Sequence, residues 1–189
     1  MLTTPESEYD PDDNFANSSD AGAEVDDEAD TEALVWQLLL LINPGDDEAA
    51  LQQFDAWREA MAGSDPDEVD AVSLLRDAID WKSGFHVAAT DVAGLLESID
   101  ELAARWNLRI DWGVEDTGDE AFLRDADAAT LIALAHARLR EDGYTLWTWQ
   151  PRAAVREDVH AGWIALRRDD EAMEAIAPAL GIDVRPGRA

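Results

Sequence analysis

The chain has 189 residues, of which 43 are acidic and 14 are basic, so its formal net charge is −29. A chain this acidic repels nucleic-acid phosphates and anionic membrane surfaces, and we expect neither as a partner. The absence of cysteine excludes disulfides, zinc–thiolate sites and thiol nucleophiles.

The charge is concentrated in the first 30 residues, which hold 11 acidic residues and no basic one. A segment with so few apolar side chains cannot offset its ordering entropy, so we predict a disordered acidic tail over 1–30. A single globular α/β domain is expected over 31–187. No secretory signal is visible, and the longest apolar run, Leu38 to Ile42, is too short to span a bilayer. A cytoplasmic location is therefore expected.

Three helices are predicted first in the chain. Apolar residues at helical spacing predict one from Asp30 or Thr31 to Ile42, one from about Asp47 to Met61, and one from about Asp67 to Asp80. The motif Asn43-Pro44-Gly45 ends the first helix, and Gly63-Ser64-Asp65-Pro66 ends the second.

A βαβ unit is predicted next. Residues 84–88 form a short strand, Thr90 caps a helix that continues to Trp106, and residues 108–112 alternate strictly between apolar and polar side chains. A strand, a helix and a second strand within so short a segment are typical of a parallel crossover.

The C-terminal part alternates loops with regular elements. An acidic loop at 115–120 precedes a helix over 127–142, strands over 144–149 and 160–166, a helix that begins at Asp169 or Asp170, and a short strand at 182–184. The predicted fold is α+β or α/β, with about six helices around a small mixed sheet of four to five strands. Its C-terminal part is expected to be ferredoxin-like.

Several Trp-rich strings resemble a bacterial family known as domain of unknown function 6630. They are Leu41-Ile42-Asn43-Pro44, Ile79 to Val87, Ala104 to Gly113, Tyr144 to Trp149, and Gly162-Trp163-Ile164. The resemblance covers about residues 34–187. It implies a compact bacterial domain and no catalytic residue.

Motifs for nucleophilic catalysis and for phosphate binding are missing. The sequence has no Gly-x-Ser-x-Gly elbow and no glycine-rich phosphate loop. The three histidines are widely spaced, and the acidic clusters do not fit a calcium-binding loop. We therefore expect no catalytic residue, no cofactor and no metal.

Strand parity divides the predicted sheet into two faces, because successive strand side chains point to opposite sides. One face holds Phe85, Val87, Leu108, Ile110, Trp112, Leu146, Ile164 and Leu166, and predicts a core. The other face holds the candidate binding residues His86, Arg109, Asp111, Trp147, Trp149 and Trp163. Either this second face binds a ligand, or the N-terminal helices cover it and bury the tryptophans. We favour the second interpretation.

Two functions follow from these patterns. The acidic charge favours a non-enzymatic binding or regulatory module for a basic protein partner. The alternative is a small hydrolase or a sugar-binding protein that uses the Trp-lined face. The sequence does not indicate an oligomeric state.

Overall fold

The computed structural model describes residues 21–65, 70–152 and 158–187. The chain divides into two compact units, Met1–Ala33 and Leu34–Ala189, and the sheet with all its packing lies in the second unit. The helices are α1 (Ala21–Ile42), α2 (Asp47–Gly63), α3 (Ala71–Ala78), α4 (Val92–Ala104), α5 (Glu120–Asp125), α6 (Ala128–Glu141) and α7 (Asp170–Ala179). The strands are β1 (Phe85–Ala88), β2 (Tyr144–Pro151), β3 (Val159–Leu166) and β4 (Ile182–Pro186), and a short 3₁₀ turn, Arg167–Asp169, precedes α7.

The α+β prediction is confirmed, but the sheet is not mixed. Its order is β1-β3-β2-β4, and all three pairings among the described strands are antiparallel. The C-terminal part keeps the strand–helix–strand–strand–helix–strand order of a ferredoxin-like fold, with β3 between β1 and β2. It departs from that fold in its last strand, because β4 pairs with β2 and not with β1.

The predicted βαβ unit is also wrong, because residues 108–112 form no strand. The chain turns out of α4 through Asn107, which adopts a left-handed conformation with φ of 58°. Ile110 and Trp112 are then buried against α4 and α6, while Arg109 and Asp111 are exposed. The alternating pattern correctly predicted an extended segment with one buried side. It did not reveal whether another strand lies beside that segment.

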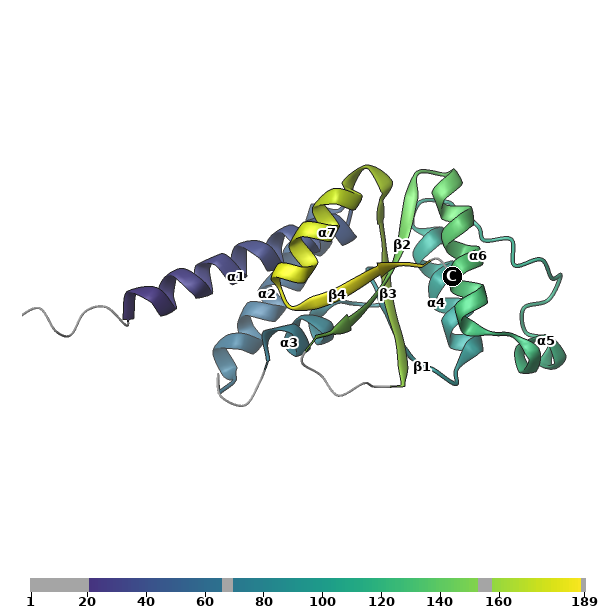
Figure 1. Ribbon diagram of the computed structural model, residues 1–189, viewed down its shortest axis with the longest axis horizontal. Coiled ribbons are helices and arrows are strands. Elements are labelled where there is room, and N and C mark those ends of the chain that lie inside the picture. The colour runs from purple at the N-terminus through teal and green to yellow at the C-terminus, as the bar shows by residue number, and fades with distance from the viewer. Residues whose placement is uncertain (1–20, 66–69, 153–157, 188–189) are drawn as a thin grey trace, which may run out of the picture. The chain divides into compact units, whose positions relative to one another are not determined.

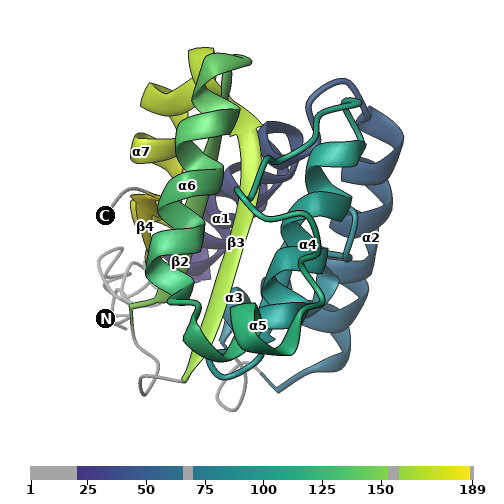
Figure 2. The same cartoon turned by 90° about the vertical axis from the view of Figure 1, so that its right-hand side faces the viewer.

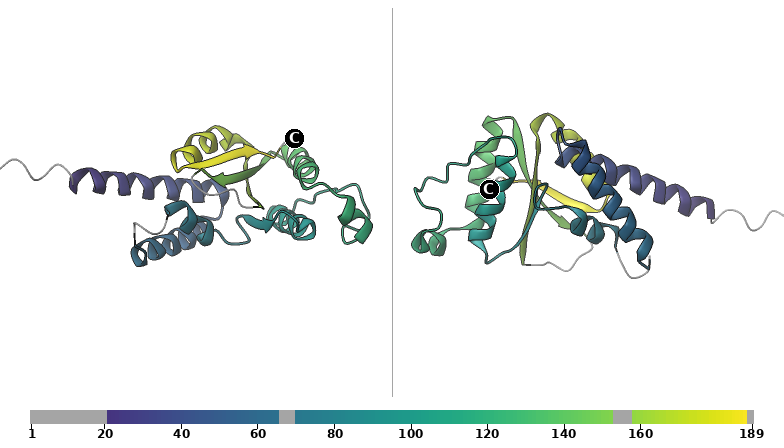
Figure 3. Two further views of the ribbon diagram at one scale, coloured as in Figure 1. Left: turned by 60° about the horizontal axis from the view of Figure 1, so that its bottom comes forward. Right: turned by 180° about the vertical axis from the view of Figure 1, so that it is seen from behind.

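Helices cover both faces of the sheet. Figure 1 shows α4 and α6 on one side of β2 and β3, with α2, α3 and α7 on the other. Figure 2 looks onto the α4–α6 layer, and Figure 3 shows from two further directions that the sheet separates the two helical layers. Each layer encloses its own apolar cluster.

Strand parity assigned the two clusters correctly. Phe85, Leu146 and Ile164 lie in the cluster formed with α4 and α6. Trp147 and Trp163 lie in the other, with α1, α2, α3 and α7. Trp147 and Trp163 are direct partners in the register of β2 and β3, so their side chains lie side by side within this second cluster.

Several boundaries differ from the predictions. Helix α1 begins at Ala21, before the predicted start at Asp30 or Thr31, whereas the tail prediction for residues 1–20 lies outside the described residues. Helix α4 is capped by Asp91, not Thr90, because the Asp91 carboxylate accepts the Gly94 N–H at 2.8 Å. Helix α5 was missed within the acidic segment; it is capped by Asp119.

Trp163→Ala should lower the free energy of unfolding by about 3–5 kcal/mol, because it leaves a large cavity in the core. Trp163 is 0 % exposed, whereas Trp81 is 62 % exposed and provides the control, for which Trp81→Ala should cost far less. Denaturant unfolding measures both. Similar losses for the two variants would contradict the assignment of Trp163 to the core.

Candidate functional site

The tryptophan-rich face of the sheet is core and not an open binding surface. Trp147, Trp149 and Trp163 are 1 %, 5 % and 0 % exposed, and the rings of Trp149 and Trp163 stack with centroids 5.3 Å apart. The indole N–H groups of Trp147 and Trp163 have no hydrogen-bond acceptor among the described residues, so these two rings contribute by packing. Of the two interpretations of this face, the structure therefore supports the one in which helices cover it and bury the tryptophans.

The structure does not bring the polar candidates together. His86 lines a pocket with Trp149 on the side of the sheet that faces α3. Arg109 and Asp111 are exposed on the extended segment after α4, whose buried side chains pack into the other apolar cluster. The predicted combination of His86, Arg109 and Asp111 in one site is therefore wrong.

A buried hydrogen-bond network joins the loop that precedes β1 to α2 and to the C-terminal ends of α1 and α4. Asn43 is 0 % exposed and donates to the Leu39 carbonyl at 2.9 Å and to Gln53 Oε1 at 3.1 Å. The Ser83 hydroxyl donates to Asn43 Oδ1 at 2.6 Å and accepts from Gln53 Nε2 at 2.7 Å. With every one of these groups bonded, the network can be buried without a large desolvation penalty.

Arg105 closes this network from the end of α4. Its guanidinium donates to Asn43 Oδ1 at 3.2 Å and to the Lys82 carbonyl, and it lies 3.5 Å from the Asp46 carboxylate. Three of the strings that carry the family resemblance, which contain Asn43, Ser83 and Arg105, therefore meet at one point. Because Ser83 is only 1 % exposed and fully bonded, this site is structural and not a nucleophilic centre.

Asn43→Ala should lower the free energy of unfolding by at least about 2 kcal/mol, because it leaves Ser83, Gln53 and Arg105 short of partners. Gln37→Ala is the control, since Gln37 is exposed on α1. Chemical denaturation with a fluorescence readout compares the two. An Asn43→Ala variant as stable as the control would show that the network adds little.

An acidic hollow of about 590 Å³ lies under the segment after α4. Asp100, Asp111 and Glu115 contribute carboxylates to it, and Arg109 is its only basic side chain. Trp112 fixes the segment, because its indole N–H lies 3.1 Å from each oxygen of the Asp100 carboxylate. Between residues 111 and 120 the sequence has five acidic residues and no basic one.

Burial raises the pKa of the Asp100 carboxyl, while the Trp112 hydrogen bond and the Arg109 charge act in the opposite direction. The folded protein therefore favours the protonated carboxyl more than the unfolded chain does. The stability that this gives is present at low pH and is lost as the pH rises through the folded-state pKa. Burial partly desolvates the ionised form of Asp100, and a cation in the hollow would offset that cost.

Asp100→Asn should consequently stabilise the protein relative to wild type near pH 7, because the amide carries no charge and still offers an oxygen to Trp112. The advantage should shrink as the pH falls toward the folded-state pKa of Asp100. Urea unfolding at several pH values measures the difference. A variant that is less stable than wild type throughout would mean that hydrogen bonding and Arg109 outweigh desolvation.

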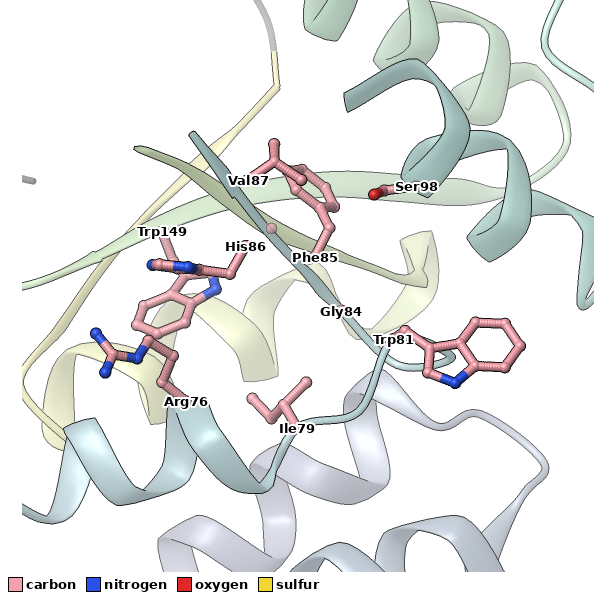
Figure 4. Close-up of a pocket in the computed structure, with 10 residues that line it drawn as sticks. Arg76, Ile79, Trp81, Gly84, Phe85, His86, Val87, Ser98 and Trp149 are labelled. Atoms are coloured by element: carbon pink, nitrogen blue, oxygen red, sulfur yellow. The ribbon is translucent and has the colours of Figure 1, made fainter. Parts of the chain in front are cut away.

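A second pocket, of about 240 Å³, opens beside β1. Figure 4 shows the side chains of Arg76 and His86 directed toward Trp149 at one end, and Trp81 directed away at the other. The β1 pocket was not recognised from the sequence, because residues far apart in the chain line it. The acidic hollow is lined by residues between 100 and 117, and it was missed because that segment was expected to form a strand.

Metal binding and membrane insertion find no support in the described part of the chain. No group of three or more His, Asp or Glu side chains in it is arranged to hold a metal ion. None of the helices described is long and apolar enough to cross a membrane.

The fold is thus α+β, with an antiparallel sheet between two helical layers, a buried polar network, and surface depressions that include the acidic hollow and the β1 pocket. The family model described as Domain of unknown function (DUF6630) matches residues 34–187, and the chain belongs to this family. No curated protein and no solved structure matches the chain.

Proposed function

We propose that this protein is a non-enzymatic binding module that captures a basic protein partner at the acidic hollow. The observation that carries the proposal is the composition of the hollow, which is lined by three acidic residues and one basic residue. An arginine or lysine side chain of the partner would complement these carboxylates.

The hollow also offers a rigid and partly apolar lining. Trp112 is buried and held by Asp100, while Val114 is 39 % exposed beside it. An arginine side chain suits such a surface, because its stem packs on apolar atoms while its guanidinium pairs with carboxylates. The carboxylates of Asp111 and Glu115 form no ion pair with any described residue, so a partner need not displace an existing one.

The alternative function, a hydrolase or sugar-binding protein on the Trp-lined face, loses its structural support. That face is covered by helices, and His86, a candidate on it, lines a different pocket from Arg109 and Asp111. The net charge of −29 also supports the proposed module, because a strongly negative protein attracts a basic partner at long range and so binds it faster.

Asp111→Asn combined with Glu115→Gln should abolish capture of the basic partner, because the double variant removes two of the three carboxylates in the hollow. The control is Asp55→Asn combined with Glu59→Gln, which makes the same charge change on exposed positions of α2. Tagged proteins are used as baits in an extract of the source cells, and captured proteins are identified by mass spectrometry.

Wild type and control should retain a basic protein that about 0.5 M salt releases, since salt screens exposed charge pairs. The hollow variant should bind the purified partner at least about tenfold more weakly, which corresponds to about 1.4 kcal/mol. Equal capture by the two double variants would contradict the proposed site. Capture of proteins that are not basic, or no capture at all, would contradict the proposed function.

A further inference from the structure

The pocket beside β1 differs from the rest of the molecule in its charge. Acidic residues make up 43 of the 189 positions, yet none of the ten described residues that line this pocket is acidic. Its charged and titratable side chains are Arg76 from α3 and His86 from β1. Arg76 also pairs with Asp77 at 3.0 Å, but the Asp77 side chain is 66 % exposed and does not line the pocket. Among the described residues, the charge that lines this pocket is therefore positive, in an otherwise acidic protein.

The remaining walls are largely apolar and rigid. Trp149 and Phe85 are buried core residues from opposite faces of the sheet, and both line the pocket, as does Ile79. Gly84 is fixed by close packing, because a Cβ there would lie 2.9 Å from the Ile79 side chain. A pocket with such walls needs little rearrangement to bind a ligand with an apolar body.

The main chain of β1 adds polar groups at the same edge. The Ala89 N–H donates to the Asp158 carbonyl at 2.8 Å, which places Phe85 and Val87 in the hydrogen-bonded pairs with β3. The N–H and C=O of His86 therefore point away from β3, toward the outer edge of the sheet. The Ser98 hydroxyl group approaches the pocket from α4.

We propose that this pocket binds a small carboxylic acid with an apolar body. The Arg76 guanidinium pairs with the carboxylate, His86 supports it, and the apolar body packs against Trp149. The volume of about 240 Å³ equals that of roughly eight water molecules in the liquid, so the acid has the size of benzoate and not of a nucleotide or an oligosaccharide.

Titration of the ¹⁵N-labelled full chain with benzoate, followed by two-dimensional NMR, tests this proposal. Benzoate should shift the signals of residues 84–87 and the Trp149 indole saturably, with a Kd of about 1 mM. Benzamide, which has the same shape without the charge, should bind at least about tenfold more weakly, and so should inorganic phosphate, which lacks the apolar body.

Arg76→Gln should weaken benzoate binding at least about fivefold, since it removes the charged partner of the carboxylate. Arg138→Gln, at an exposed position of α6, is the matched control and should bind like wild type. No saturable shift at the pocket, equal binding of benzamide or of phosphate, or equal binding by the two variants would each overturn the proposal. The benzamide and phosphate comparisons use wild-type protein, so they remain decisive even if Arg76→Gln does not fold. None of these outcomes depends on the basic partner proposed for the acidic hollow.

Discussion

The buried hydrogen bonds around Asn43 fix the positions of the helices that cover the tryptophan face. Asn43 ends α1, Gln53 belongs to α2, and Ser83 lies in the loop that leads into β1. Arg105 ties the end of α4 into the same group. Buried polar groups tolerate few alternative arrangements, because each lost partner leaves an unsatisfied donor or acceptor. The network therefore fixes how α1 and α2 are placed relative to α4 and to the loop before β1. Apolar packing alone tolerates more than one such arrangement.

The tryptophans become core because of this arrangement. Strands β2 and β3 place Trp147 opposite Trp163, and α1, α2, α3 and α7 supply the apolar side chains that cover them. Because helices cover this face of the sheet, the tryptophans are closed to ligands. The β1 pocket lies at an edge of the sheet, and the acidic hollow lies under the segment after α4.

Charge is distributed unevenly between these two depressions. The hollow gathers Asp100, Asp111 and Glu115, whereas the described residues that line the β1 pocket include Arg76 and His86 but no carboxylate. A protein with a net charge of −29 repels anions at long range, so binding of an acid requires short-range contacts in a partly desolvated pocket. The two proposed ligands therefore have opposite charges and use separate surfaces.

The sequence by itself determined the α+β class, most helix cores and the two faces of the strands, because periodicity records which side of each element is buried. It correctly grouped Leu146 with Ile164, and Trp147 with Trp163. Only the tertiary structure decided that residues 108–112 have no strand beside them, and that Arg109 and Asp111 are far from the face that holds His86. Strand pairing, the covering of the sheet by helices and the β1 pocket all depend on contacts between segments distant in the chain. Local patterns of hydrophobicity carry no information about which distant segment makes these contacts.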